Sequence, residues 1–166
     1  MFLRQKKGAK LVEGAGDGKG TLVLSDGSRY VGELKKGAAH GEGTITFTDG
    51  RVLSGSFAEG NPHGQDLVLT FPDGRKYTGE YRGGRRHGWG KMSFPDGQIY
   101  AGEWKNDHPE GEGSMTYPDG TIEKGRWVRG RKIDPDAQEP ERKFSKTLYL
   151  IPVLLIIIVV IIYLNV

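Results

Sequence analysis

The chain of 166 residues contains no cysteine. Disulfide bonds and thiolate-ligated metal sites are therefore excluded, although this absence alone does not identify a cellular compartment. The first residues, MFLRQKKGAKLV, include basic side chains but no apolar stretch as long as a secretory signal needs. We therefore expect no cleaved signal at this end of the chain.

Motifs typical of catalysis are also missing. The sequence has no G-x-S-x-G nucleophile turn, no G-x-x-x-x-G-K phosphate loop and no H-E-x-x-H metal-binding helix. Its many G-x-G tripeptides are not followed by a helical pattern, so they do not indicate nucleotide binding. We therefore expect no enzyme activity, no catalytic residues and no cofactor.

Helical periodicity is absent until the last twenty residues, and the chain is instead rich in glycine, with 27 of them. Two residue columns repeat about every 23 positions, namely a Y-x-G-E motif and an Asp-Gly pair that closes each unit. The motif begins at Tyr30, Leu53, Tyr77, Tyr100 and Glu123, and the pairs begin at Asp26, Asp49, Asp73, Asp96 and Asp119. A fixed period of this length indicates an array in which each unit contacts only its neighbours.

Within a unit, side chains alternate between two faces, as in β-strands. Tyr77, Gly79 and Tyr81 share one face of the first expected strand, and Gly90 lies on the same face of the second. This face is therefore aromatic plus glycine, and the other is polar. Because glycine weakens a strand unless another group must approach closely, we expect each glycine to leave room for a neighbouring ring. Trp89 has the opposite parity and is expected to be exposed.

The expected fold is all-β: a single elongated, twisted antiparallel sheet of stacked β-hairpins with roughly eleven short strands, followed by one transmembrane α-helix. The Asp-Gly pairs predict tight turns, since glycine takes the positive φ that a type I′ turn requires. The segment 64–73 has an extra residue and lacks the G-x-G tripeptide, which predicts a β-bulge or a local bend.

Three segments closely resemble MORN repeats: YVGELKKGAAHGEGTITFTDG, YTGEYRGGRRHGWGKMSFPDG and YAGEWKNDHPEGEGSMTYPDG. The resemblance covers about residues 14–132. It departs from the pattern at Leu53 and Glu123, which lack the leading tyrosine, and at Ser56 and Arg126, which lack the usual glutamate. The resemblance implies a single-sheet solenoid used for protein binding, self-association or placement of modules near phospholipid membranes. The order of repeats followed by a C-terminal membrane anchor is similar, in miniature, to that of junctophilin-like proteins. The chain lacks the long helical region that those proteins have between the two parts.

The last segment differs from everything before it. Residues 148–166 read LYLIPVLLIIIVVIIYLNV, carry no charge and would span about 30 Å as a helix, one hydrocarbon thickness. We predict a single-pass transmembrane helix here, with a buried element of the soluble domain as the alternative. Basic residues precede this segment and none follows it, so the repeats are expected on the cytosolic side. The expected domains are a basic N-terminal segment, the repeat sheet, a Pro-rich charged linker and the membrane helix, at 1–12, 13–132, 133–146 and 147–166.

Neither the histidine column nor the glutamate column predicts a site of metal or acid–base chemistry. His40, His63 and His87 recur in successive units, hence two strands or about 9.5 Å apart, whereas ligands of one zinc ion lie within about 3.5 Å of each other. The motif glutamates, such as Glu80 and Glu103, are separated in the same way. We expect them to be solvated partners of nearby lysines and arginines.

Two surfaces are candidate binding sites. A groove on the aromatic face is expected to hold a protein partner, although the same rings would also pack on one another. Its residues are Tyr30, Tyr77, Tyr81, Tyr100, Trp104 and Trp127. Basic side chains near a tethered membrane are candidates for anionic phospholipid, at about 1 kcal/mol each, although basic loops also serve solubility. These are Arg85, Arg86, Arg129, Arg131, Lys132, Arg142, Lys143 and Lys146.

The sequence thus predicts a tail-anchored, non-enzymatic scaffold that recruits a protein partner or contacts a membrane. Alternatives are an accessory structural subunit of a larger integral membrane complex and a regulatory module for a lipid-modifying enzyme. Nucleic acid is not an expected partner, because no unbroken basic stripe is present. Pairing of chains through open sheet edges, which would give a homo-oligomer, is left open.

Overall fold

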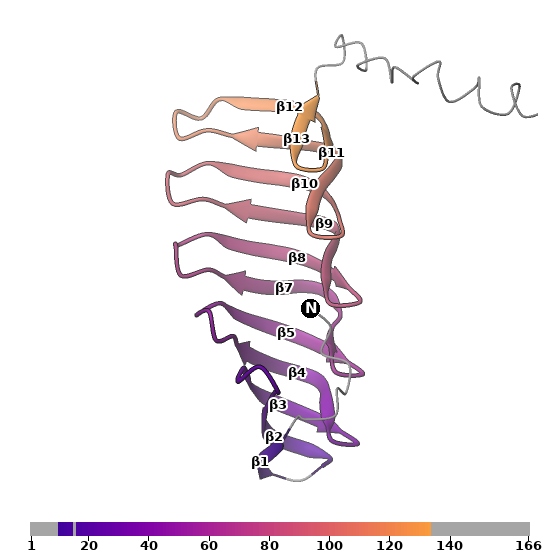
Figure 1. The fold of residues 1–166 in the computed structure, drawn as a ribbon. Helices are drawn as coiled ribbons and strands as arrows, with labels where there is room; N and C mark the ends of the chain where they lie inside the picture. The colour runs from indigo at the N-terminus through magenta and orange to yellow at the C-terminus, as the bar shows by residue number, and fades with distance from the viewer. Residues whose placement is uncertain (1–9, 15, 134–166) are drawn as a thin grey trace, which may run out of the picture. The chain divides into compact units, whose positions relative to one another are not determined.

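The structure, a computed structural model, describes residues 10–14 and 16–133. These residues form one antiparallel sheet of thirteen strands, which confirms the expected all-β class and the single open sheet (Figure 1). The strands are β1 (Lys10–Gly14), β2 (Gly18–Val23), β3 (Arg29–Lys35), β4 (Ala38–Thr46), β5 (Val52–Ala58), β6 (Asn61–Pro62), β7 (Gly64–Thr70), β8 (Lys76–Arg82), β9 (Arg85–Ser93), β10 (Ile99–Lys105), β11 (His108–Thr116), β12 (Ile122–Val128) and β13 (Arg131–Ile133). Each strand pairs with the next in sequence, except that β6 pairs with β5 alone and β7 continues the sheet beside β5.

The sheet has more strands than the sequence predicts. One addition is β1, in which Lys10 pairs with Val23 although residues 1–12 were expected to form a separate basic segment. The other is β6, where the strand that is continuous in other units is divided. The proline alone does not divide the strand, because Pro109 occupies the equivalent position in β11, which is unbroken. The predicted bulge follows directly and is confirmed by a register shift between Gly64 and Leu67.

The Asp-Gly turns differ from the predicted type I′ geometry. In the turn after β4, the Gly50 amide donates to the Phe47 carbonyl (3.0 Å) and the Phe47 amide donates to the Arg51 carbonyl (2.8 Å). Only Gly50, at φ 84°, has a positive φ there, so the loop is a type I turn closed by a left-handed glycine. The residue before Asp takes the second position of this turn. It is proline in three later units, such as Pro72, and the fixed φ of proline favours a type I turn at that position.

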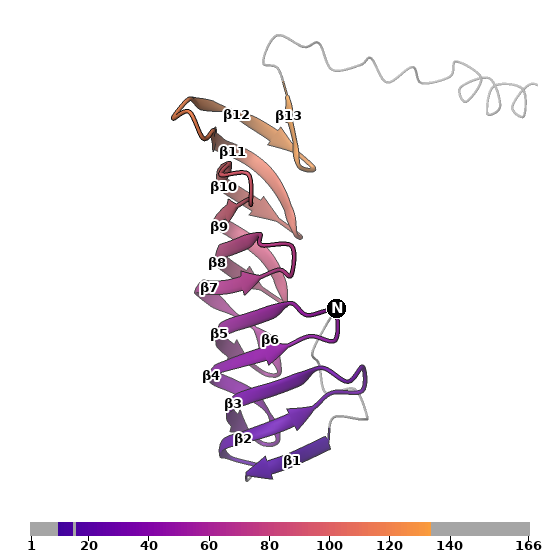
Figure 2. The same cartoon turned by 90° about the vertical axis from the view of Figure 1, so that its left-hand side faces the viewer.

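The Asp-Gly turns line one edge of the array, and the internal loops of the units line the other (Figure 1). Each internal loop donates a backbone hydrogen bond to the preceding unit. The donors and acceptors are Gly37 to Gly16 (2.7 Å), Gly60 to Ala39 (2.9 Å), Gly84 to Pro62 (3.4 Å), Asp107 to Arg86 (3.1 Å) and Gly130 to Pro109 (2.9 Å). Figure 2 shows the same hairpins stacked in sequence order from β1 to β13. This second ladder holds the loops against the aromatic face of the sheet.

The core lies on the aromatic face in two clusters. One is centred on Tyr30 and Ile45, and the other runs from Leu53 to Trp127. Within ranges 10–14 and 16–133, no helix is long and apolar enough to cross a membrane. The transmembrane helix predicted at 147–166 and linker residues 134–146 lie outside these ranges, so both stay predictions.

Candidate functional site

Each complete repeat places a tyrosine ring over the glycines of two paired strands. The Tyr77 hydroxyl donates to the Glu80 carbonyl (3.0 Å), so the ring lies along its own strand. A Cβ added at Gly90 would lie 2.6 Å from Cζ of Tyr77, and one at Gly79 would lie 2.8 Å from its hydroxyl oxygen. The prediction that these glycines leave room for a ring is therefore confirmed. The same hydroxyl contact joins Tyr30 to Glu33 (2.7 Å) and Tyr100 to Glu103 (3.1 Å).

The rings of successive repeats contact one another edge to face. Tyr77 lies 5.6 Å from Tyr81 and 5.0 Å from Trp104, measured between ring centroids. Trp104 then meets Tyr100 at 5.5 Å, and Tyr100 meets Trp127 at 5.1 Å. Five of the six groove candidates thus form one continuous chain of rings across three units. Such edge-to-face pairs contribute about 0.5–1.5 kcal/mol beyond the area that they bury.

The sixth candidate, Tyr30, packs against Phe57 in the other cluster. None of the six side chains has more than 5% of its surface exposed, so they contact each other rather than solvent. Burial raises the pKa of Tyr30 and of Tyr100 to about 12, so their hydroxyls stay protonated as donors even in mildly alkaline solution. The aromatic face is therefore closed in this structure, and a partner would reach the rings only if the loops opened.

Arg86, a candidate for lipid, is part of this closure. Its guanidinium lies over the Trp104 ring at 4.6 Å and over the Tyr77 ring at 5.5 Å. It also donates to the Asp107 carbonyl (2.8 Å) and pairs with the Asp107 carboxylate (3.3 Å). With 17% of its side chain exposed, Arg86 links two units instead of facing a membrane.

The other basic candidates lie in different settings. Lys132 pairs with Glu123 (3.0 Å), and its stem covers Gly125 as tyrosine covers glycine elsewhere. This lysine closes the end of the core. Arg129 and Arg131 are exposed, and Arg85 is half-buried. Arg142, Lys143 and Lys146 lie outside the residues that the structure describes.

The motif glutamates have a role that sequence reasoning missed. Glu80 accepts a hydrogen bond from the Trp89 amide (2.9 Å), and Glu103 accepts one from the Glu112 amide (3.2 Å). The Glu80 carboxylate lies against Gly88, which has a φ of 62° and leaves space for it. These carboxylates therefore hold the bulge of each hairpin, and the interpretation as solvated partners of basic side chains misses this contact. A glycine eight residues after each glutamate is the signal that could have indicated it.

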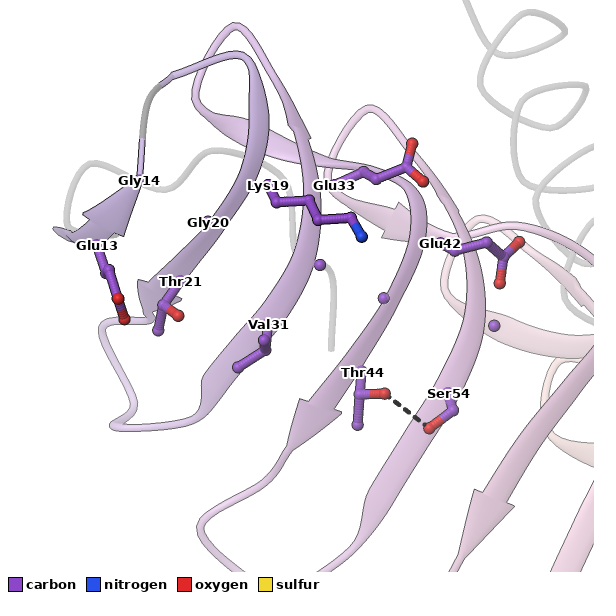
Figure 3. A pocket seen from close by; sticks show the side chains of 13 residues that line it. Glu13, Gly14, Lys19, Gly20, Thr21, Val31, Glu33, Glu42, Thr44 and Ser54 are labelled. Atoms are coloured by element: carbon purple, nitrogen blue, oxygen red, sulfur yellow. Dashed lines mark hydrogen bonds between the residues drawn. The ribbon is translucent and has the colours of Figure 1, made fainter.

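The face opposite the rings has a shallow hollow of about 670 Å³ near its N-terminal end. Figure 3 shows Lys19, Glu33 and Glu42 along one side of the hollow and Val31 on the other side. Beside Val31, the hydroxyls of Thr44 and Ser54 hydrogen-bond across neighbouring strands. Backbone at the glycine row forms the floor between them. Sequence reasoning did not find this hollow. The spacing of the glycines does not show that their backbone is covered by rings on one face of the sheet and left uncovered on the other.

Trp89 lies on this same open face. Its surface is 57% exposed, which confirms the sequence prediction, and it stands directly opposite Glu103 on β10. Other units carry a charged residue at the centre of the G-x-G tripeptide, namely Lys19, Glu42 or Glu112. The fold therefore does not require an indole here.

Among residues 10–14 and 16–133, no group of three His, Cys, Asp or Glu side chains is placed to hold a metal ion. Two of the aligned histidines use their backbone in the sheet. The His40 carbonyl accepts from the Tyr30 hydroxyl (3.2 Å), and the His63 amide donates to the Ser56 carbonyl (3.0 Å). The absence of catalytic residues and of a cofactor stays a prediction.

A family model described as the MORN repeat matches residues 11–29, 30–50, 77–99 and 100–122, more than half of the chain. The unmatched residues 51–76 include the divided strand and the bulge. No curated protein sequence matches the chain. A similar solved structure is the TCP domain of SAS-4 (dCPAP) of Drosophila melanogaster in complex with a proline-rich motif of Ana2 (dSTIL), at 14% identity, 71% coverage of this chain, 77% of that chain and a TM-score of 0.30. That similarity is too weak to support an argument.

Proposed function

We propose a binding function from the premise that this chain belongs to the MORN-repeat family, as its four matched repeats show. Repeats of this family serve in general as scaffolds that bind proteins or membranes. For this chain we propose a non-enzymatic scaffold, anchored in a membrane by its C-terminal segment, that recruits a protein partner to its sheet.

The contrast between the two faces of the sheet carries this proposal. One face is filled by rings that are at most 5% exposed, so it provides the stability of the array. The other face is open and includes Trp89, a large aromatic side chain that the fold does not use. Exposed aromatic residues are typical anchors of protein interfaces. The partner surface is therefore expected on the open face, around Trp89.

Membrane anchoring rests on the sequence of the last segment. Residues 148–166 are uncharged and long enough to cross the hydrocarbon core as a helix, and Arg142, Lys143 and Lys146 precede them. This order supports a single-pass tail with the repeats on the cytosolic side. The scaffold would then hold its partner within reach of that membrane.

Trp89→Lys is expected to weaken partner recruitment strongly without harming the fold. Lysine occupies the equivalent position at Lys19, which stands opposite Glu33 as residue 89 stands opposite Glu103. An aromatic anchor typically contributes about 2 kcal/mol, or roughly 30-fold in affinity. The measurement is quantitative mass spectrometry of proteins that co-purify with the full chain after mild detergent extraction, with thermal unfolding as the folding control.

Trp89→Phe is the matched control, because it keeps a ring at the same site. We expect it to retain most of the partner that the unsubstituted chain retains. If Trp89→Lys recovered the same proteins in the same amounts, the open face around Trp89 would not be the recruiting surface.

A further inference from the structure

The last hairpin, β12–β13, departs from the earlier units on the open face. Where β8 and β10 carry Glu80 and Glu103, β12 carries Arg126. At the position after the motif tyrosine, where those strands carry small residues, β12 carries Lys124. Arg126 stands opposite Glu112, so a cross-strand charge pair explains its change of charge. Lys124 stands opposite Ser114, and no cross-strand pair explains its charge.

Strand register brings six side chains of this hairpin onto one face. Alternation places Ile122, Lys124, Arg126 and Val128 together on β12. Ile133 stands opposite Arg126 and Arg131 stands opposite Val128, so both belong to the same face. We call these six residues the terminal patch. Its three cations face one carboxylate by register, that of Glu112 opposite Arg126.

The terminal patch also exposes apolar side chains. Ile122 is 59% exposed, Val128 38% and Ile133 37%. Of the five large hydrophobic side chains that are exposed in the described part of the chain, three therefore lie in this one hairpin. Neither Glu123 nor Lys132, which pair with each other, belongs to the patch, because both lie on the core face with Trp127.

We infer that the terminal patch is the surface with which this scaffold lies on an anionic bilayer. Aliphatic side chains flanked by lysine and arginine are the combination that an interface of headgroups and acyl chains favours. An acidic protein would also match this combination, so the choice of a bilayer follows from the uncharged apolar segment 148–166 that comes after this hairpin in the chain. This inference rests on the proposed anchoring of the chain in a membrane and names the part of the sheet that lies on that membrane.

The position of the patch in the chain supports a lipid occupant. The uncharged apolar segment from Leu148 follows Ile133 after fourteen residues, which reach at most about 50 Å. A tail inserted in the bilayer would hold the patch at a high local concentration near the headgroups, so weak contacts suffice. Arg129, in the turn of this hairpin, is also exposed, and its backbone amide donates to the Glu110 carboxylate (2.9 Å), which offsets part of its charge.

The test uses the full chain in phosphatidylcholine vesicles with or without phosphatidylserine. Because the chain has no cysteine, Ile122→Cys can carry an environment-sensitive dye at a single site. We expect a blue shift of the dye only in vesicles that contain phosphatidylserine, and its loss at high salt. The same dye on Val31→Cys, an exposed aliphatic position far along the array, should not shift.

Lys124→Thr with Arg126→Ser changes the patch to residue types of the earlier units, Thr78 and Ser56, and puts no like charge opposite Glu112. Each lost cation should weaken the contact about fivefold, so the affinity of the patch for the anionic surface should fall by more than an order of magnitude and the salt-sensitive shift should shrink. Lys91→Thr is the matched control, since Lys91 is exposed and lies in the same cross-strand row through Ala101 and Ser114. It should leave the shift unchanged.

A dye shift that is equal in neutral vesicles, absent in both, or insensitive to the double substitution would overturn the inference. Flotation of the chain with neutral vesicles separately reports tail insertion. If flotation failed, the anchoring proposal would fail, while dye response to added phosphatidylserine vesicles would still decide the patch.

Discussion

Tyr77→Ala is expected to lower the free energy of unfolding by about 3–5 kcal/mol, the range for deleting a buried aromatic ring. Tyr77 is 0% exposed and contacts Tyr81, Trp104 and the Arg86 guanidinium, so its loss opens a cavity between two repeats. In an array stabilised by contacts between neighbours, such a cavity uncouples the units on either side. Urea unfolding of the full chain in mild detergent, followed by circular dichroism, measures the effect.

Two variants set the scale for that result. Tyr77→Phe keeps the ring and removes only the hydroxyl bond to Glu80, so a loss of about 0.5–1.5 kcal/mol is expected. Tyr117→Ala removes a half-buried ring near the edge of the core and should cost less than Tyr77→Ala. Equal stability of the two alanine variants would contradict a core built on the motif tyrosines.

Gly90→Ala is expected to destabilise by about 1–3 kcal/mol, as overpacking of a filled core does. The new methyl group would lie 2.6 Å from Cζ of Tyr77, and the ring has no free space on its other side because Trp104 packs there. The effect is steric, since Gly90 does not have a positive φ. The same urea titration measures it.

The double variant Tyr77→Ala with Gly90→Ala tests the mechanism directly. Removing the ring removes the clash, so the double variant should be more stable than the sum of the single changes by about 0.5–3 kcal/mol. Gly16→Ala is the control, because its added methyl would be 3.7 Å from the nearest atom. Strict additivity would mean that ring and glycine do not share one space.

Strand parity explains why so much of the fold is predictable from the sequence. Alternation shows that Tyr77, Gly79 and Tyr81 share a face, and the glycines indicate that rings lie flat on it. Parity does not show whether that face is open. The internal loops close it through backbone bonds such as Gly84 to Pro62, which depend on backbone geometry and not on residue type. The rings proposed as a partner groove are therefore found in the core.

Side-chain contacts with backbone were the least predictable part of the site. The Glu80 carboxylate binds the Trp89 amide and lies against Gly88. A search for side chains of opposite charge does not reveal this contact with the backbone. Arg86 is one of several arginines in its loop, and the sequence does not show that it stacks on Trp104. By contrast, exposure of Trp89 followed from parity alone, because its neighbours Gly88 and Gly90 fix its side of the strand.

Fluorine NMR of the full chain labelled with 5-fluorotryptophan can show whether the aromatic face is closed and the opposite face is open. The three tryptophans sample both faces, since Trp104 and Trp127 are at most 5% exposed and Trp89 is 57% exposed. A soluble paramagnetic agent should broaden one resonance, assigned to Trp89 by its absence in Trp89→Phe, and leave the other two sharp. Broadening of the Trp104 or Trp127 resonance to the same extent would mean that solvent reaches the aromatic face.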